Sequence, residues 1–347
     1  MKKRISVLVA AVLAIGCLSV GCGNGAAGGE VSVGLGLHTQ MDYSSKDATA
    51  DKAGLAQADL TVAAVTLNAD GTIAAIKVDA IQVKTNFDAT GAITADTPTS
   101  FKTKRELGND YNMKGTSEGI GKIPGGAEWF EQADAFEGWA KGKTLAQVEA
   151  VINSEGYSND DTLTAGCTMK INGFVAATVK AIKEAQAGTY KAPAADALSI
   201  GIVAEVSSPT SATAEKAGGA TSYANFVAVT SNNGKISCCI LDSVQAKIAW
   251  DTTGKITSDL KEDTTTKYDL KEKYGMKETS KNKGVIAEGG EWYEQADVFM
   301  AHVKNMTIDQ VKAIAVDDGG YPTEDTLKAG CTMKVTAYIA AVEKALK

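Results

Sequence analysis

The chain has 347 residues, of which 44% are hydrophobic and 22% charged, and its formal net charge is −7. The hydrophobic fraction is that of a globular protein, which excludes a disordered or collagen-like chain, and the length predicts two domains. An acidic chain without a basic run lacks the clustered lysine and arginine that bind phosphates, so we expect no nucleic-acid partner. Six cysteines and two histidines are too few for a disulfide scaffold or a histidine-built metal centre.

The N-terminal segment has the layout of a secretory signal. Residues 1–4 are basic, an apolar run follows to Val20, and Gly21-Cys22 leads into glycine-rich polar sequence. The apolar run is too short and wrongly flanked for a spanning helix. The cleavage region resembles a bacterial lipobox, in which the cysteine receives a diacylglycerol group. We therefore expect residues 1–21 to be a signal peptide, Cys22 to be lipidated and residues 22–32 to form a tether. An ordinary cleaved signal is the alternative.

A lipid on Cys22 would hold the mature protein at the cell membrane, on its extracytoplasmic face. The sequence has no second long apolar segment, so we expect the remainder to lie outside the bilayer, with the lipid anchor as its contact with the membrane.

Much of the chain repeats itself. Residues 128–134, EWFEQAD, recur 163 residues later as EWYEQAD at 291–297, and residues 161–170 recur at 325–334, a spacing of 164. Agreement over so long a span indicates a tandem duplication, and each copy is about one domain long. We expect repeat domains at 33–186 and 198–347, joined by a linker at 187–197 that is rich in small residues.

Strands are expected first in each copy. The pattern predicts a strand at 33–37 and a hairpin of residues 60–67 and 72–83, with a tight turn at Asp70-Gly71. In the second copy the first strand covers 198–202, and the hairpin turn is Asn233-Gly234, the strongest short hairpin signal.

Helices are expected after the strands. Trp129, Ala133, Phe136 and Ala140 fall on one helix face, residues 144–152 read as a short helix capped by Thr144, and a last helix follows in each copy. Strands followed by segregated helices predict an α+β fold class, with two tandem copies of one antiparallel-sheet-plus-helices domain.

Two further groups of residues, repeated glutamates and adjacent cysteines, are expected to have structural rather than chemical roles. Glutamates three residues apart on the repeated helix, Glu128 with Glu131 and Glu291 with Glu294, are expected on a solvated face rather than as acid/base pairs. The adjacent Cys238 and Cys239 lack a metal or redox spacing and are expected to be packing residues.

The segments Ala165-Gly166-Cys167-Thr168 and Ala329-Gly330-Cys331-Thr332 stand just before the last helix of each copy. They resemble the Ser/Thr-Gly-Ala-Thr element of the FMN-binding domain, which occurs in the covalent-flavin subunits of the sodium-pumping NADH:quinone reductase and Rnf complexes. The duplicated layout and the lipobox are similar to a set of Gram-positive lipoproteins with two such domains, which includes the flavinylated pheromone-precursor lipoproteins of flavin-based extracellular electron transfer.

The resemblance implies an electron carrier. FMN would be joined through its phosphate to the hydroxyls of Thr168 and Thr332 by a flavin transferase, and electrons would come from a membrane quinol-linked donor. A helix N-terminus suits a phosphate, the glycines allow close backbone approach and an unusual φ, and the tryptophans are candidates to pack on the isoalloxazine ring. The implied cofactor-binding residues are Gly166, Cys167, Thr168, Gly330, Cys331, Thr332, Trp129 and Trp292.

The chain also departs from the family's pattern. Asp161 lies seven residues before Thr168 where the family has six, Ala165 replaces Ser or Thr, and Lys170 stands where a hydroxyl is usual. The alternative is therefore that Gly-Cys-Thr is a structural helix cap, in which case the chain is a cofactor-free ligand-binding or scaffold lipoprotein of the cell envelope.

Overall fold

The computed structural model describes residues 29–95, 97–98, 100–261 and 264–347. The predicted signal peptide, Cys22 and most of the tether lie outside these residues. Within the described part of the chain, no helix has the length and apolar character needed to cross a bilayer. We call residues 30–193 the first half and residues 197–347 the second half.

The fold is mixed α/β with two antiparallel sheets, as the strand patterns predict. The first sheet has the order β3-β2-β1-β4, and the second has the order β5-β6-β7. The strands are β1 (Glu30–Gln40), β2 (Gly54–Leu67), β3 (Ile73–Phe87), β4 (Tyr190–Pro193), β5 (Ala197–Thr210), β6 (Gly218–Asn232) and β7 (Lys235–Trp250).

Helices follow the strands in each half in the same order. The first half has α1 (Lys104–Leu107), η1 (Gly108–Tyr111), α2 (Lys114–Ile120), α3 (Trp129–Ala140), α4 (Leu145–Glu149), α5 (Asp161–Thr164) and α6 (Asn172–Ala187). The second half has α7 (Lys267–Leu270), η2 (Lys271–Tyr274), α8 (Lys277–Lys281), α9 (Trp292–Val303), α10 (Ile308–Lys312), α11 (Asp325–Lys328) and α12 (Thr336–Ala345).

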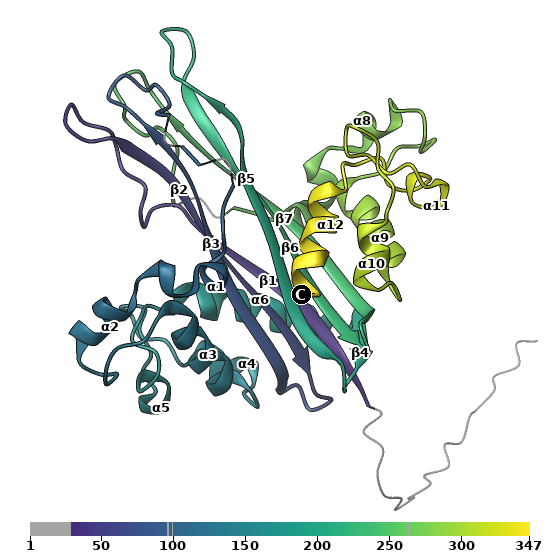
Figure 1. The fold of residues 1–347 in the computed structure, drawn as a ribbon, viewed down its shortest axis with the longest axis horizontal. Helices are drawn as coiled ribbons and strands as arrows, with labels where there is room; N and C mark the ends of the chain where they lie inside the picture. The colour runs from purple at the N-terminus through teal and green to yellow at the C-terminus, as the bar shows by residue number, and fades with distance from the viewer. Residues whose placement is uncertain (1–28, 96, 99, 262–263) are drawn as a thin grey trace, which may run out of the picture.

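The two sheets pack face to face, and helices cover their outer sides, which gives four layers (Figure 1). Alternate residues of β2 serve the two faces: Leu60 and Val62 belong to a buried cluster that continues into the second half, whereas Ala63 and Val65 pack with α3 and α6. The halves therefore do not have wholly separate cores, because strands of both contribute to one hydrophobic cluster.

Glycines on the central strands let the long helices approach closely. A Cβ atom on Gly36 of β1 would overlap the carbonyl oxygen of Ala177 in α6, and one on Gly201 of β5 would overlap that of Ala341 in α12. Small residues on both surfaces thus bring each helix against its sheet.

Reciprocal contacts join the halves at one end of the sandwich. The amide of Ala48 donates to the carbonyl of Gly254 at 2.8 Å, and the amide of Ala212 donates to that of Gly91 at 2.9 Å. These residues match one another at the repeat spacing. Between them the rings of Phe87 and Trp250, another matched pair, stack at 4.4 Å and 3°. The interface therefore has approximate two-fold character, like that of a symmetric dimer.

Local signals placed the turns and caps correctly. Asn233-Gly234 forms the hairpin loop with φ values of 49° and 73°, and Thr144 caps α4 with its side chain. The predicted linker differs, because Tyr190–Pro193 within it forms β4, which pairs with β1 at the sheet edge.

Candidate functional site

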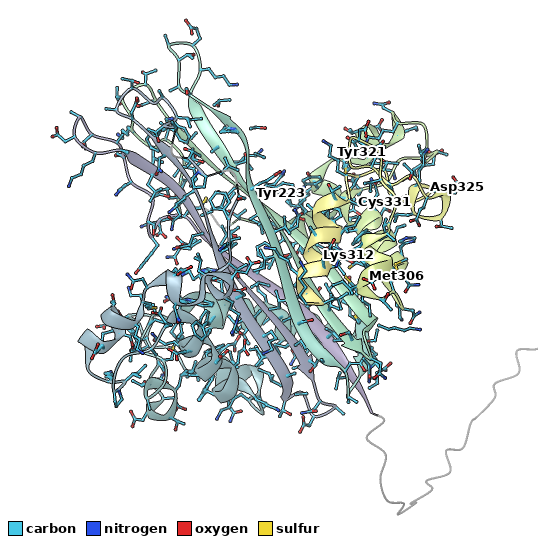
Figure 2. All side chains as sticks on the ribbon, viewed as in Figure 1. Tyr223, Met306, Lys312, Tyr321, Asp325 and Cys331 are labelled. Carbon is cyan, nitrogen blue, oxygen red and sulfur yellow. The ribbon has the colours of Figure 1, made fainter. Side chains whose placement is uncertain are left out.

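The Gly-Cys-Thr loops lie between a short helix and the last helix of each half. The N-caps of α6 and α12 are Ile171 and Val335, so Thr168 and Thr332 stand three residues before them and not at a helix N-terminus. The expectation that Thr168 and Thr332 cap the last helices is therefore wrong. Figure 2 shows Cys331 among the helices of the second half, on the side of the sheet where Tyr223 lies.

A buried glutamine holds each loop. Gln132 of α3 accepts from the amides of Thr168 at 2.8 Å and Met169 at 3.2 Å, and its Nε2 donates to the carbonyl of Ala127 at 3.1 Å. Gln295 of α9 accepts from the amide of Thr332 at 2.7 Å in the same way. The fifth residue of the repeated EWxEQAD motif thus brackets the threonine loop.

The threonine hydroxyls point inward. Thr168 Oγ1 lies 3.3 Å from Gln132 Oε1 and 3.4 Å from the hydroxyl of Ser117 on α2. Thr332 Oγ1 lies 3.0 Å from Gln295 Oε1 and 3.2 Å from the hydroxyl of Ser280 on α8. The two threonines are only 6% and 5% exposed. A phosphodiester at either oxygen would need space that α2 or α8 fills, so these residues do not fit covalent FMN in this geometry.

The glycines next to these threonine loops are packing residues. A Cβ on Gly166 would lie 2.8 Å from the side chain of Ala135, and one on Gly330 would lie 2.8 Å from that of Val298, so each glycine permits close packing against α3 or α9. Neither glycine has a positive φ, which corrects the expected unusual backbone.

The described cysteines are free and buried, including Cys238 and Cys239, as expected for packing residues. Burial raises the pKa of the Cys167 thiol to about 12 and that of Cys331 to about 11, so neither is a ready nucleophile.

The tryptophans are core residues. Trp129 is 3% exposed and meets Phe174 edge-on at 5.5 Å, and Trp292 is 1% exposed and donates from Nε1 to Tyr338 at 3.1 Å. Their rings are enclosed by the protein itself, so neither offers a free face to a flavin here.

A lysine lies over each tryptophan ring. Lys104 Nζ is 5.4 Å from the ring centre of Trp129, and Lys267 Nζ is 5.7 Å from that of Trp292. Burial lowers the pKa of Lys267 to about 8, and Tyr223 accepts from its Nζ at 3.1 Å.

The first glutamate of each repeated pair is not on a solvated face. Glu128 is buried, and its carboxylate accepts from the amides of Met113 at 2.8 Å and Lys114 at 3.2 Å at the start of α2. Glu291 does the same for α8, accepting from Met276 at 2.8 Å. The expected solvated face is wrong for these two, which cap a neighbouring helix, whereas Glu131 and Glu294 are exposed as expected.

A cavity of about 540 Å³ opens where the halves meet. It is lined from the first half by β1, α6 and the segment before β4, and from the second half by β7 and the start of α7. Its polar lining residues include Lys180, Glu184, Tyr190, Asp242, Tyr268 and Lys271. We call this cavity the inter-half cleft.

Two carboxyl groups of the cleft are perturbed by burial. Glu184 accepts from the amide of Leu35 at 2.5 Å, and burial raises its pKa to about 7, with a further rise from Asp242 and Asp269. Asp242 keeps part of its surface open to the cleft, yet it lies deep enough that burial raises its pKa to about 7.

A chain of hydroxyl groups crosses the cleft. Tyr190 donates to the hydroxyl of Tyr268 at 2.9 Å, and Tyr268 donates to Asp297 at 2.8 Å. The first tyrosine belongs to the first half and the second to the other, so the cleft exists only when both halves are together.

The repeat itself contains a sequence feature that points to this cleft. Asp79 and Thr103 recur at the repeat spacing as Asp242 and Thr266. Each aspartate accepts one amide at the start of a short helix and one from the next residue of its strand. Among the residues that the structure describes, no cluster of His, Cys, Asp or Glu is arranged to hold a metal ion.

Comparison with protein-family models, with curated proteins and with solved structures found no match to this chain.

Proposed function

We propose that this protein is a lipid-anchored binding protein of the cell envelope, which takes up a small ligand in the inter-half cleft. The proposal rests on the cleft itself, whose volume of about 540 Å³ lies in the range of about 300–1,000 Å³ usual for ligand pockets. Convergent polar groups and carboxyl groups with raised pKa values, Glu184 and Asp242, are features of binding sites.

Native mass spectrometry of the protein purified from its membrane tests this proposal. We expect a non-covalent adduct that dissociates on activation. The variant Thr189→Trp, which places a large ring in the cleft lining, should lose the adduct. Glu155→Trp, at an exposed loop position outside the lining, is the matched control and should keep it. An adduct that survives Thr189→Trp would place the ligand elsewhere.

We further propose that the two halves are tandem copies of one α+β domain. The common order of their elements, the matched Gln132 and Gln295 brackets and the reciprocal contacts of the two halves support this. If the copies remain close in structure, replacing either Gln132 or Gln295 by leucine should lower the free energy of unfolding.

The anchor is supported by the sequence layout around Cys22. The variant Cys22→Ala should move the protein from the membrane fraction to the soluble fraction and remove the diacylglycerol mass. Membrane retention of Cys22→Ala would argue against this anchor.

Flavin-based electron transfer, which the resemblance implies, is the second candidate, and the same Gln–Thr–Ser arrangement in both halves favours a shared role for the threonines. It requires α2 and α8 to move away from the enclosed hydroxyls of Thr168 and Thr332. FMN would supply the redox chemistry when bound, with a flavin transferase and a quinol-linked donor as partners. Protein made in its host should then fluoresce on a denaturing gel. Peptides carrying Thr168 and Thr332 that lack an FMN mass would remove this candidate.

A further inference from the structure

The two ends of the sandwich where a long helix meets the other half differ in charge pairing. At one of them, Lys344 of α12 pairs with Glu106 of α1 at 2.7 Å. Beside it, Arg105 pairs with Asp134 at 2.7 Å and Glu137 at 2.6 Å, and its Nε donates to the carbonyl of Val78 at 2.7 Å. Glu106, Asp134 and Glu137 thus each pair with a cation of the chain, while the buried Asp79 accepts backbone amides instead.

The inter-half cleft is the matching place in the other half, and it lacks those cations. At the repeat spacing of 163, Arg105 becomes Tyr268, and the ion pair of Lys77 with Glu137 becomes Ile240 with Met300. The other acidic residues of that end, Asp79, Glu106 and Asp134, remain acidic as Asp242, Asp269 and Asp297. In the described residues no salt bridge involves the acidic groups at the cleft, which are Glu184, Asp242, Asp269 and Asp297.

The cleft lysines do not replace the missing arginine. Lys271 Nζ lies over the rings of Tyr268 at 3.5 Å and Tyr293 at 4.4 Å, and Lys183 is 3.6 Å from Glu149 outside the cleft. Lys180 also lines the cleft without an ion pair among the described residues. Lys271 and Lys267 interact electrostatically with Glu184 and Asp242, respectively, but form no salt bridge with them among the described residues. Partly buried carboxylates without a direct ion pair cost free energy, and a bound cation would recover it.

We propose that the inter-half cleft binds a small organic molecule with one ammonium or guanidinium group, whose charge contacts Glu184 and Asp242. This rests on the proposed binding function. The ring of Tyr268 offers a surface for the carbon atoms next to the charge. Lys180 and Lys271 repel a second positive charge, so the far end of the ligand is neutral or anionic, as in an ω-amino or ω-guanidino carboxylate.

Titration calorimetry of the mature protein at pH 8 tests this. The probes are γ-guanidinobutyrate and γ-aminobutyrate, which carry one cationic group each, with γ-ureidobutyrate as the match without the cation and glutarate and inorganic phosphate as anions. We expect at least one of the two cationic probes to bind with a Kd below about 1 mM, with γ-guanidinobutyrate at least about tenfold tighter than γ-ureidobutyrate. Glu184→Gln should weaken binding at least about tenfold, whereas Asp134→Asn, at the other end, should leave it unchanged.

Tyr268→Arg supplies the sharpest variant, because it restores the residue found at the matching position. Its guanidinium should occupy the acidic site, abolish cation binding and raise the melting temperature. A cation that binds Tyr268→Arg as tightly as the parent would overturn the inference.

The outcomes separate this inference from the proposed function. Binding of γ-ureidobutyrate, glutarate or phosphate in the cleft, lost in Thr189→Trp, would refute the cation but keep the binding protein. Absence of binding by every probe, together with no native adduct by mass spectrometry, would refute both. Circular dichroism of each variant establishes that the fold is retained.

Discussion

Replacing Gln132 by leucine tests whether the repeated helix motif holds the threonine loop. The change keeps side-chain size but removes the oxygen that accepts from the amides of Thr168 at 2.8 Å and Met169 at 3.2 Å. Both amides lie in a buried environment, where an unsatisfied donor costs about 1–3 kcal/mol. The free energy of unfolding should therefore fall by about 4 kcal/mol, a large share of the roughly 5–15 kcal/mol typical of a domain.

Urea unfolding followed by circular dichroism measures this loss, and hydrogen exchange reports the Thr168 and Met169 amides directly. Gln186→Leu, at an exposed position of α6, is the matched control and should change stability little. Gln295→Leu should cost about 1–3 kcal/mol, since Gln295 accepts from one backbone amide, that of Thr332 at 2.7 Å. A loss of unfolding free energy below about 1 kcal/mol, with unchanged hydrogen exchange of both amides, would show that Gln132 does not hold the threonine loop.

Three further predictions concern the core and the cleft. Thr178→Val should raise the unfolding free energy by about 1 kcal/mol in a urea titration, because Thr178 Oγ1 is buried without a partner. Gly201→Ala should lower the melting temperature sharply, since its Cβ would overlap the Ala341 carbonyl; an unchanged melt would contradict that packing. Burial raises the pKa values of Glu184 and Asp242 to about 7, so the folded state binds the extra protons and stability should fall as pH rises from about 4 to 7. The double variant Glu184→Gln/Asp242→Asn should flatten that fall in melts across pH, and an unaltered slope would assign it to other groups.

Local features of the fold were predictable because they depend on neighbouring residues. The Asn233-Gly234 turn needs two residues that accept positive φ, and the Thr144 cap needs a hydroxyl ahead of a helix. The edge strand β4 was not predictable from the sequence, since Tyr190–Pro193 becomes a strand only by pairing with β1, far away in the chain.

The roles of the site residues needed the tertiary structure. The EWxEQAD repeat was visible, but Glu128 and Gln132 act on the backbones of Met113 and Thr168, which a helical pattern does not reveal. Glu184 gave no signal at all, because its importance arises only where α6 meets the other half.

The reciprocal contacts between the halves have a consequence for stoichiometry. In a two-fold dimer of separate chains, the two places where a long helix meets the other half would be identical, so any site formed there would occur twice or not at all. Joining the halves in one polypeptide removes that restriction, because each position then mutates independently of its match. One end keeps Arg105 and its ion pairs, while the matching Tyr268 faces the inter-half cleft. Covalent fusion thus allows one end to serve as a fixed joint and the other to bind a single ligand per chain.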